Sequence, residues 1–271
     1  MSQGPLLETL GFVADQSLFL LFLALLAIYM AVAEIGYRIG RRAFNSRTAD
    51  ETARSGIGFI VGGILGLLAF LLGISLSLAD SRHNERRGVV LNEANAIGTA
   101  WLRAGVIGGD EGARMQSLIA EYGEVRVRVY RDIRTRDDGD RLDAETARLQ
   151  GALWQIATDV ARANPNAVSG LMLSSLNEMF DLATTQKRFF TERVPLHILR
   201  LLLWTSIIAV GAMGYHFGST GFRQLVMSTL LLVLWASALV LIVDINRPRQ
   251  GTVTISHDPI VWTLESFGPR R

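Results

Sequence analysis

Hydrophobic residues are gathered into four blocks separated by charged segments, and each block is about long enough to cross a bilayer as a helix. The blocks cover residues 18–33, 57–79, 196–213 and 225–243, and the first helix is expected to extend to about residue 37. Two blocks precede a long polar segment and two follow it. The pattern predicts an all-α, polytopic membrane protein with four transmembrane helices, arranged two plus two.

The second apolar block runs into polar sequence without a residue that would break a helix. Residues 57–79 carry no charge, and as a helix they span roughly 35 Å at 1.5 Å per residue. Beyond this block, Val90, Ala94 and Ile97 keep near-helical spacing. The second membrane helix is therefore expected to continue, unbroken, into an extramembrane domain.

The segment between the two pairs of spans, residues 80–195, is too long for a simple connection and has helical periodicity. Apolar residues at steps of three or four mark helices near 115–133, 142–160 and 168–183. The run from Asp137 to Asp140 is expected to form a turn between the first two. These helices predict a bundle continuous with the second and third spans.

Four segments follow from this organisation. They are an N-terminal membrane hairpin (1–79), a central helical domain (80–195), a C-terminal membrane hairpin (196–243) and a docked tail (244–271). The first span could instead be a signal peptide, but its leading 17 residues contain Glu8 and Asp15 and no Lys or Arg. A signal peptide begins with basic residues, so a retained membrane helix is favoured.

Charges near the spans bear on which side of the membrane the domain lies. Five arginines fall in the loop 38–56, and Lys and Arg in short loops favour the cytoplasm. That rule places the loop inside and the central domain outside. Basic residues on the domain side of the spans, such as Arg82 and Lys187, argue the other way. The first helix usually dominates, so the balance favours a non-cytoplasmic domain.

Composition narrows the possible functions. The chain has no cysteine, so thiolate chemistry and thiolate metal sites are excluded. Residues 80–195 carry 16 Lys and Arg against 17 Asp and Glu, without the basic excess of a nucleic-acid-binding domain. The four histidines lack metal-ligand spacing, and no phosphate loop or nucleophile elbow is present. The sequence predicts no enzyme activity, cofactor or metal, and lipid and further copies of the chain are the expected partners.

Small residues form one face of the second span. They recur at steps of three or four and comprise Gly62, Gly66, Ala69, Gly73 and Ser77. Such a stripe lets helix backbones approach closely. One interpretation is packing within the chain or between copies; the other is that several copies of this face line a pore around a symmetry axis.

Two polar groups of residues have alternative interpretations. Ionisable residues at the expected membrane edge could pair or extend towards water, or could form a vestibule that concentrates anions; they are Asp80, Arg82, Arg86, Arg87, Arg200 and Asp244. Further along the second helix, Asn92, Glu93 and Asn95 interrupt an apolar stretch. They are expected to hydrogen-bond across helices and set their register, with a gate or ligand site as the alternative.

Three segments resemble a bacterial, bestrophin-like membrane family of unknown function: LLGISLSLADSRHNERRGVVLNEANAIGTAWLRA, NEMFDLATTQKRFFTERVP and DINRPRQGTVTI. The resemblance covers nearly the whole chain and implies location in the bacterial inner membrane. Bestrophins proper are pentameric channels, mostly anion-selective, whose second helix lines the pore. The resemblance implies that Phe59, Leu67 and Phe70 are candidate constriction residues, by position, and that the domain is cytosolic, contrary to the charge count.

Two functions follow as expectations. The first is an oligomeric, passive ion channel, with anions as the expected ions. The alternative is a non-conducting membrane scaffold or sensor whose helical domain binds a protein partner. The number of copies in the assembly discriminates between them, because a ring of four or five supports a pore and a monomer or dimer favours the scaffold.

Overall fold

The computed structural model describes residues 18–45, 51–133, 135–191, 195–246 and 255–268. Within these ranges the chain forms eight helices and no strand. The helices belong to two compact units. One, here called the membrane unit, contains residues up to Arg82 and from Arg193 to Thr254; the other, the helical domain, contains His83–Glu192 and Ile255–Arg271.

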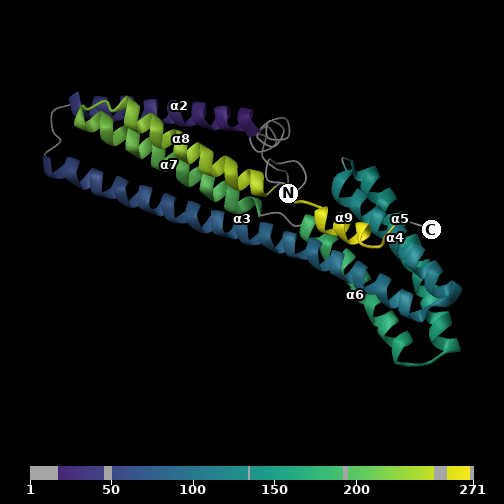
Figure 1. The fold of residues 1–271 in the computed structure, drawn as a ribbon. Helices are drawn as coiled ribbons and strands as arrows, with labels where there is room; N and C mark the ends of the chain where they lie inside the picture. The colour runs from purple at the N-terminus through teal and green to yellow at the C-terminus, as the bar shows by residue number, and fades with distance from the viewer. Residues whose placement is uncertain (1–17, 46–50, 134, 192–194, 247–254, 269–271) are drawn as a thin grey trace. The chain divides into compact units, whose positions relative to one another are not determined.

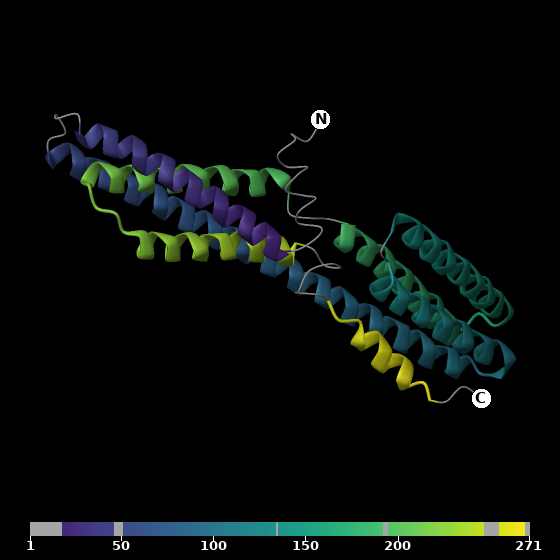
Figure 2. The same cartoon turned by 90° about the horizontal axis from the view of Figure 1, so that it is seen from above.

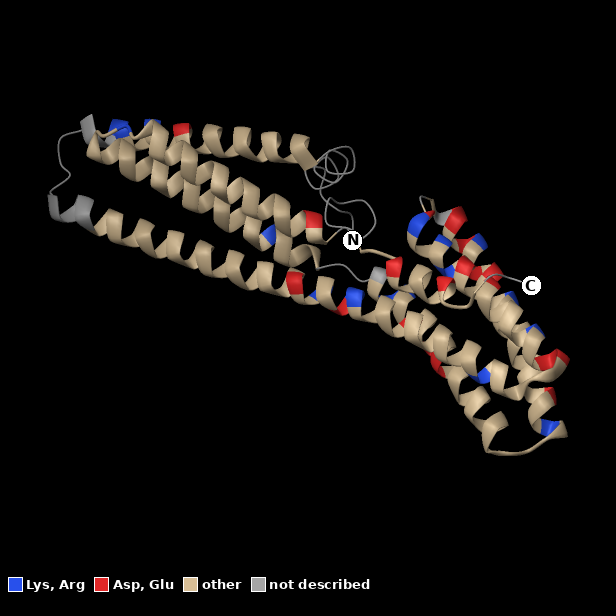
Figure 3. Ribbon diagram, viewed as in Figure 1, with Lys and Arg blue, Asp and Glu red and all other residues tan. Residues whose placement is uncertain are grey.

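The membrane unit contains four helices that are long and apolar enough to cross a bilayer. They are α2 (Leu18–Asn45), the first part of α3 (Glu51–Ile107), α7 (Leu196–Thr220) and α8 (Leu225–Ile245). In Figures 1 and 2 they run lengthwise beside one another. Figure 3 shows charged residues near the ends of these spans and none along their middle. The predicted set of four spans is confirmed.

Helix α3 belongs to both units, as its apolar and polar halves predict. It has 57 residues, which is about 86 Å of helix at 1.5 Å per residue. It contains no proline, which would remove a backbone hydrogen bond and kink the helix. The continuous passage from the second span into the domain is therefore seen as one helix.

The helical domain consists of the second part of α3 with α4 (Gly109–Arg131), α5 (Arg136–Ala163), α6 (Ala167–Thr191) and α9 (Asp258–Glu265). Its core is made of fully buried apolar residues at helical spacing, among them Ile97, Met115, Ile119, Leu153 and Leu176. Burial of one face of each helix is what holds such a bundle together.

The predicted turn at Asp137–Asp140 is wrong, because these residues form the first turns of α5. Thr135 is the N-cap: its hydroxyl accepts a hydrogen bond from the Asp138 amide at 3.2 Å, and the Asp138 carboxylate accepts one from the Thr135 amide at 3.0 Å. Carboxylates are favoured in the first turn of a helix, where they satisfy free amides and oppose the helix dipole. The acidic run begins a helix for this reason.

The passage into the third span differs from that into the second. Helix α6 ends at Thr191 and α7 begins at Leu196, with Pro195 in an extended conformation at its N-cap. Proline lacks the amide proton that a helix interior needs. Helix α6 of the bundle and helix α7 of the third span are therefore two separate helices, and the predicted continuity of the bundle with the third span is wrong.

The C-terminal segment docks on the helical domain. Figure 2 shows α9 lying along α3. The rings of Trp101 and Phe267 are stacked with centroids 4.5 Å apart, and the side chain of Leu264 lies directly over Gly123 of α4. Residues 255–268 thus pack on the domain core, to which Ile255 and Ile260 belong, whereas residues 247–254 and 269–271 of the expected tail lie outside the described residues.

Candidate functional site

The small-residue face of α3 is not covered by any other helix among the described residues of the membrane unit. All five of its members are exposed: Gly62, Gly66, Ala69, Gly73 and Ser77. A methyl group added at Gly62, Gly66 or Gly73 would meet no described atom within 4 Å. The opposite side of the helix is the packed one, since Val61, Leu68 and Leu72 are buried in the core of this unit.

Large apolar side chains lie on the same open surface. Phe59 is 86% exposed, Phe70 63% and Leu67 53%. Each residue advances about 100° around a helix, so Phe59 and Phe70 lie within roughly 40° of Gly66, and Leu67 lies about 100° away. The two phenylalanines therefore belong to the small-residue face, and Leu67 lies to one side of it.

A second set of small residues forms a packed helix interface that sequence reasoning missed. A methyl group added at any of four glycines would overlap the backbone of the partner helix: Gly36 against Gly211, Gly40 against Tyr215, Gly214 against Ala33, and Gly218 against Tyr37. The sequence signal is present, because two pairs of these glycines have four-residue spacing. Helices α2 and α7 thus approach as closely as their backbones allow.

The candidate vestibule residues occupy different environments. Asp80, Arg87 and Arg200 are exposed, whereas Asp244 is 4% exposed. Arg86 is 1% exposed, and its Nε donates to the Phe189 carbonyl oxygen at 2.9 Å. The Nε atom of Arg82 is buried without a hydrogen-bond acceptor among the described residues. Exposure to water, which a vestibule requires, therefore holds for only part of the set.

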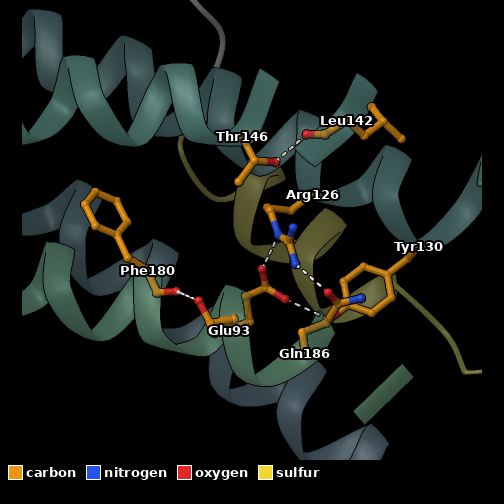
Figure 4. A network of polar contacts seen from close by, with 8 residues as sticks. Glu93, Arg126, Tyr130, Leu142, Thr146, Phe180 and Gln186 are labelled. Atoms are coloured by element: carbon orange, nitrogen blue, oxygen red, sulfur yellow. Dashed lines mark hydrogen bonds and ion pairs between the residues drawn. The ribbon is translucent and has the colours of Figure 1, made fainter. Parts of the chain in front are cut away.

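Glu93 lies at the centre of a buried polar network in the helical domain (Figure 4). It is fully buried and pairs with the Nε atom of Arg126 on α4, which is 2% exposed. The Tyr130 hydroxyl donates to the second Glu93 oxygen at 2.7 Å. Arg126 also donates, through Nη2, to the Gln186 side-chain oxygen of α6 at 2.9 Å. One carboxylate of α3 is thus tied to two further helices.

Burial and pairing fix the protonation of this network. Burial, the largest influence, lowers the pKa of Arg126, but the Glu93 charge and hydrogen bond together with Tyr122 and Tyr130 outweigh it, and the pKa lies above its ordinary value. Burial raises the pKa of Tyr130, and the Glu93 charge raises it further. Burial likewise raises the pKa of Tyr122 on the same helix. At neutral pH the arginine is charged and both tyrosines are protonated.

Asn92 and Asn95 lie close to Glu93 in the sequence, but their side chains are in a different environment. Both are exposed and line a polar groove between α3 and α6, which also includes Asn177, Glu178 and Asp181. The Asn177 amide donates to Asp181 at 3.0 Å. Among the described residues no three His, Cys, Asp or Glu side chains are grouped so that they could hold a metal ion. The three polar residues singled out on α3 therefore fall into one buried and two exposed positions.

Comparison with known proteins identifies a family and a fold. A sequence model of the bestrophin-like domain matches residues 27–260. A crystal structure of a bacterial bestrophin homologue from Klebsiella pneumoniae, phased with zinc, has a TM-score of 0.62 and 16% identity, covering 92% of this chain and 95% of that chain. A variant of that homologue has a TM-score of 0.64 and 17% identity, covering 90% of this chain and 96% of that chain. Among curated proteins, none matches the chain.

A further crystal structure, described as a membrane protein variant, has a TM-score of 0.63 at 19% identity and covers 92% of this chain and 97% of that chain. Identities this low show a shared fold, and fold alone does not determine function. The chain nevertheless matches these structures along nearly its whole length, so the membrane unit and the helical domain both belong to the common architecture.

Proposed function

The chain belongs to the bestrophin-like family of multi-pass membrane proteins, and from this premise we propose that several copies assemble around α3 into a passive ion channel. The observation that carries the proposal is the open small-residue face of α3. In a bilayer this face meets either lipid or another copy of the chain.

Self-association explains the composition of that face better than contact with lipid does. Lipid-facing positions have no requirement for glycine, whereas small residues allow helices to approach closely. Helix α8 provides the comparison within the chain, because its exposed positions include Leu230, Leu234 and Leu241. Gly62, Gly66 and Gly73 are therefore better suited to a helix interface or a pore lining than to lipid.

The two phenylalanines are the proposed constriction. Phe70 lies between Gly66 and Gly73 along the face, and Phe59 lies about three turns earlier. Large apolar rings around a symmetry axis narrow a pore and can close it by excluding water. Leu67 is the weaker candidate, because its position on the helix turns it away from the face.

Selectivity for anions stays a prediction. Asp80 and Arg87 are both exposed on α3, so the residues near the face carry charges of both signs. Of the two vestibule candidates between them, Arg86 is buried and Arg82 is half-buried. A measurement that follows cations and anions together is therefore the appropriate one.

The test is flux through the purified protein in liposomes, with chloride and potassium gradients in opposite directions. Gly66→Leu is expected to abolish flux or assembly without preventing membrane insertion. Ser237→Leu is the matched control, because it adds a similar side chain to an exposed position of α8 and should leave flux unchanged. Absence of flux in well-inserted wild-type protein, measured on both faces and across pH, would favour the scaffold or sensor.

The side of the membrane on which the domain lies can be measured in the same preparation. Because the chain has no cysteine, a single Asp140→Cys substitution gives one labelling site. Asp140 is exposed, whereas Asp138 takes part in the α5 capping box. The charge count predicts a non-cytoplasmic domain, so a membrane-impermeant reagent should label this cysteine in intact cells. Labelling only after the cell membrane is opened would show that the domain is cytosolic and that the prediction is wrong.

A further inference from the structure

A cleft of about 260 Å³ lies in the membrane unit where α2, α7 and the start of α8 meet. Its walls are mainly apolar and include Met30, Met213, Phe217 and Leu232. Glu34, Arg223 and Gln224 also line it, the last two from the short connection between α7 and α8. The cleft is thus lined by apolar side chains and by a charged group, here called its polar edge.

The polar edge carries an excess positive charge. Glu34 accepts from Arg38 at 2.9 Å through one carboxylate oxygen and from Arg223 at 2.7 Å through the other. Two guanidinium groups thus share one carboxylate. The three residues together have a net charge of plus one, and each Glu34 oxygen accepts a hydrogen bond from an arginine.

Arg223 is held in place but keeps capacity for another anion. Its guanidinium carbon lies 5.0 Å from the centroid of the Tyr37 ring, an arrangement that favours a cation over the ring face. Its side chain is 49% exposed. A guanidinium has five N–H donors in a planar fork, and Nη2 contacts Glu34. Leu225, the first residue of α8, lines the same cleft, and the free backbone amides at the start of a helix favour an anion.

We propose that this cleft binds one phospholipid with an anionic head group, its phosphate at Arg223 and part of an acyl chain against the apolar walls. The net positive charge fits a head group with one negative charge, as in phosphatidylglycerol. A zwitterionic head group would bring an ammonium whose natural acceptor, Glu34, is already paired twice. The apolar lining accounts for a lipid rather than free phosphate.

The proposal does not rest on ion conduction and is tested by binding. The full-length protein, in detergent, is titrated with phosphatidylglycerol, and bound lipid is counted by native mass spectrometry. Arg223→Gln is expected to weaken binding about tenfold or more, as expected for loss of charge-assisted hydrogen bonds. Thr229→Trp, which fills the cleft from a half-buried position of α8, is expected to prevent binding while Arg223 remains.

Controls separate this site from general affinity for lipid. Arg200→Gln removes an exposed arginine elsewhere in the membrane unit, and Ser237→Trp adds the same bulk to an exposed position of α8; both should bind as wild type. Phosphatidylethanolamine should bind more weakly than phosphatidylglycerol, and inorganic phosphate should not compete. Equal binding by wild type and both cleft variants, equal binding of the two lipids, or displacement by phosphate would overturn the proposal.

Discussion

Two glycine-bearing surfaces of the membrane unit have similar spacing and opposite surroundings. On α2 and α7, Gly36, Gly40, Gly214 and Gly218 lie against the backbone of the partner helix. On α3, Gly62, Gly66 and Gly73 face no described atom that an added methyl group could reach. Small residues at four-residue spacing therefore indicate that another helix packs closely, but they do not identify whether that helix belongs to the same chain or to another copy. The first surface packs within the chain, and we propose that the second packs or lines a pore between copies.

The helical domain repeats this contrast on a single helix. Glu93 of α3 is covered and paired with Arg126, whereas Asn92 and Asn95 are exposed. All three are polar and lie within four residues of one another. Covered positions should govern the stability of the single chain, and uncovered positions should govern assembly or conduction. Four predictions, with comparison variants, test this division, beginning with the largest effect.

Substitution at Gly40 should have the largest effect on folding. A side chain in Gly40→Leu would overlap the Tyr215 carbonyl, and Ser219 N is 2.9 Å from the first added carbon. Backbone atoms cannot turn aside as side chains do, so we expect a loss of at least about 3 kcal/mol, at the upper end for overpacking. The measurement is the yield of monodisperse protein after extraction into detergent.

Gly66→Leu is the matched comparison, since it makes the same change on the open surface. Its yield in inserted, folded form should equal that of the wild type, because leucine has better helix propensity than glycine and its first side-chain carbon would meet no described atom of the same chain. If Gly40→Leu and Gly66→Leu lowered the yield of folded protein equally, the distinction between the two glycine surfaces would be incorrect.

Breaking the buried ion pair is expected to have an effect of similar size. Arg126→Met leaves the Glu93 carboxylate buried without its cation, which typically costs 3–5 kcal/mol. Adding Glu93→Leu should recover much of that loss, because the uncompensated charge is then removed. The quantity to measure is the free energy of unfolding of each variant. A double variant less stable than Arg126→Met would show that the network is not governed by unpaired charge.

For comparison, the pair between Lys187 and Asp143 is largely exposed, with 66% and 37% of the side chains accessible. Exposed pairs contribute about 0–1 kcal/mol. Lys187→Met should therefore change the unfolding free energy by less than about 1 kcal/mol, which provides a control for the loss of a cation from the domain.

Alkaline pH should weaken the same covered network. Burial raises the pKa of Tyr130 and Tyr122 above the ordinary value of 10.0, so the folded state retains protons that the unfolded state releases. Stability is then fully present below about pH 10 and falls as the pH rises above it. Tyr130→Phe should reduce the steepness of this fall, measured as unfolding free energy against pH. An unchanged slope in the variant would remove Tyr130 as a contributor.

Much of the architecture could be predicted from the sequence because its causes are local. The length of each apolar block determines whether it can span a bilayer, and the lack of proline after Ala79 is enough to predict the continuous helix α3. The prediction of a turn at Asp137–Asp140 is wrong because the same residues suit a turn and a helix start. The Thr135 cap, three residues before Asp138, was the local signal that distinguishes the two.

The site was harder to predict because its contacts join distant parts of the chain. The exposed α3 stripe and the packed α2–α7 interface have the same kind of glycine spacing, and only the partner backbone distinguishes them. The sequence indicates that Glu93 needs a hydrogen-bonding partner, but its partner Arg126 lies 33 residues away, and Gln186, which also contacts that arginine, comes from a third helix. Nothing in the local pattern separates Glu93 from Asn92 and Asn95.

Asn95→Ala should have the smallest effect on folding and is the most direct test of the uncovered part of the domain. Asn95 is exposed beside the polar groove of α3 and α6, and substitutions at exposed positions usually change stability by less than about 0.5 kcal/mol. Unfolding of the variant should thus match the wild type. If this surface faces other copies of the chain or passing ions, the variant should still alter oligomer dissociation or flux. A stability loss comparable to that of Arg126→Met would show that Asn95 is as essential to the single chain as the covered network.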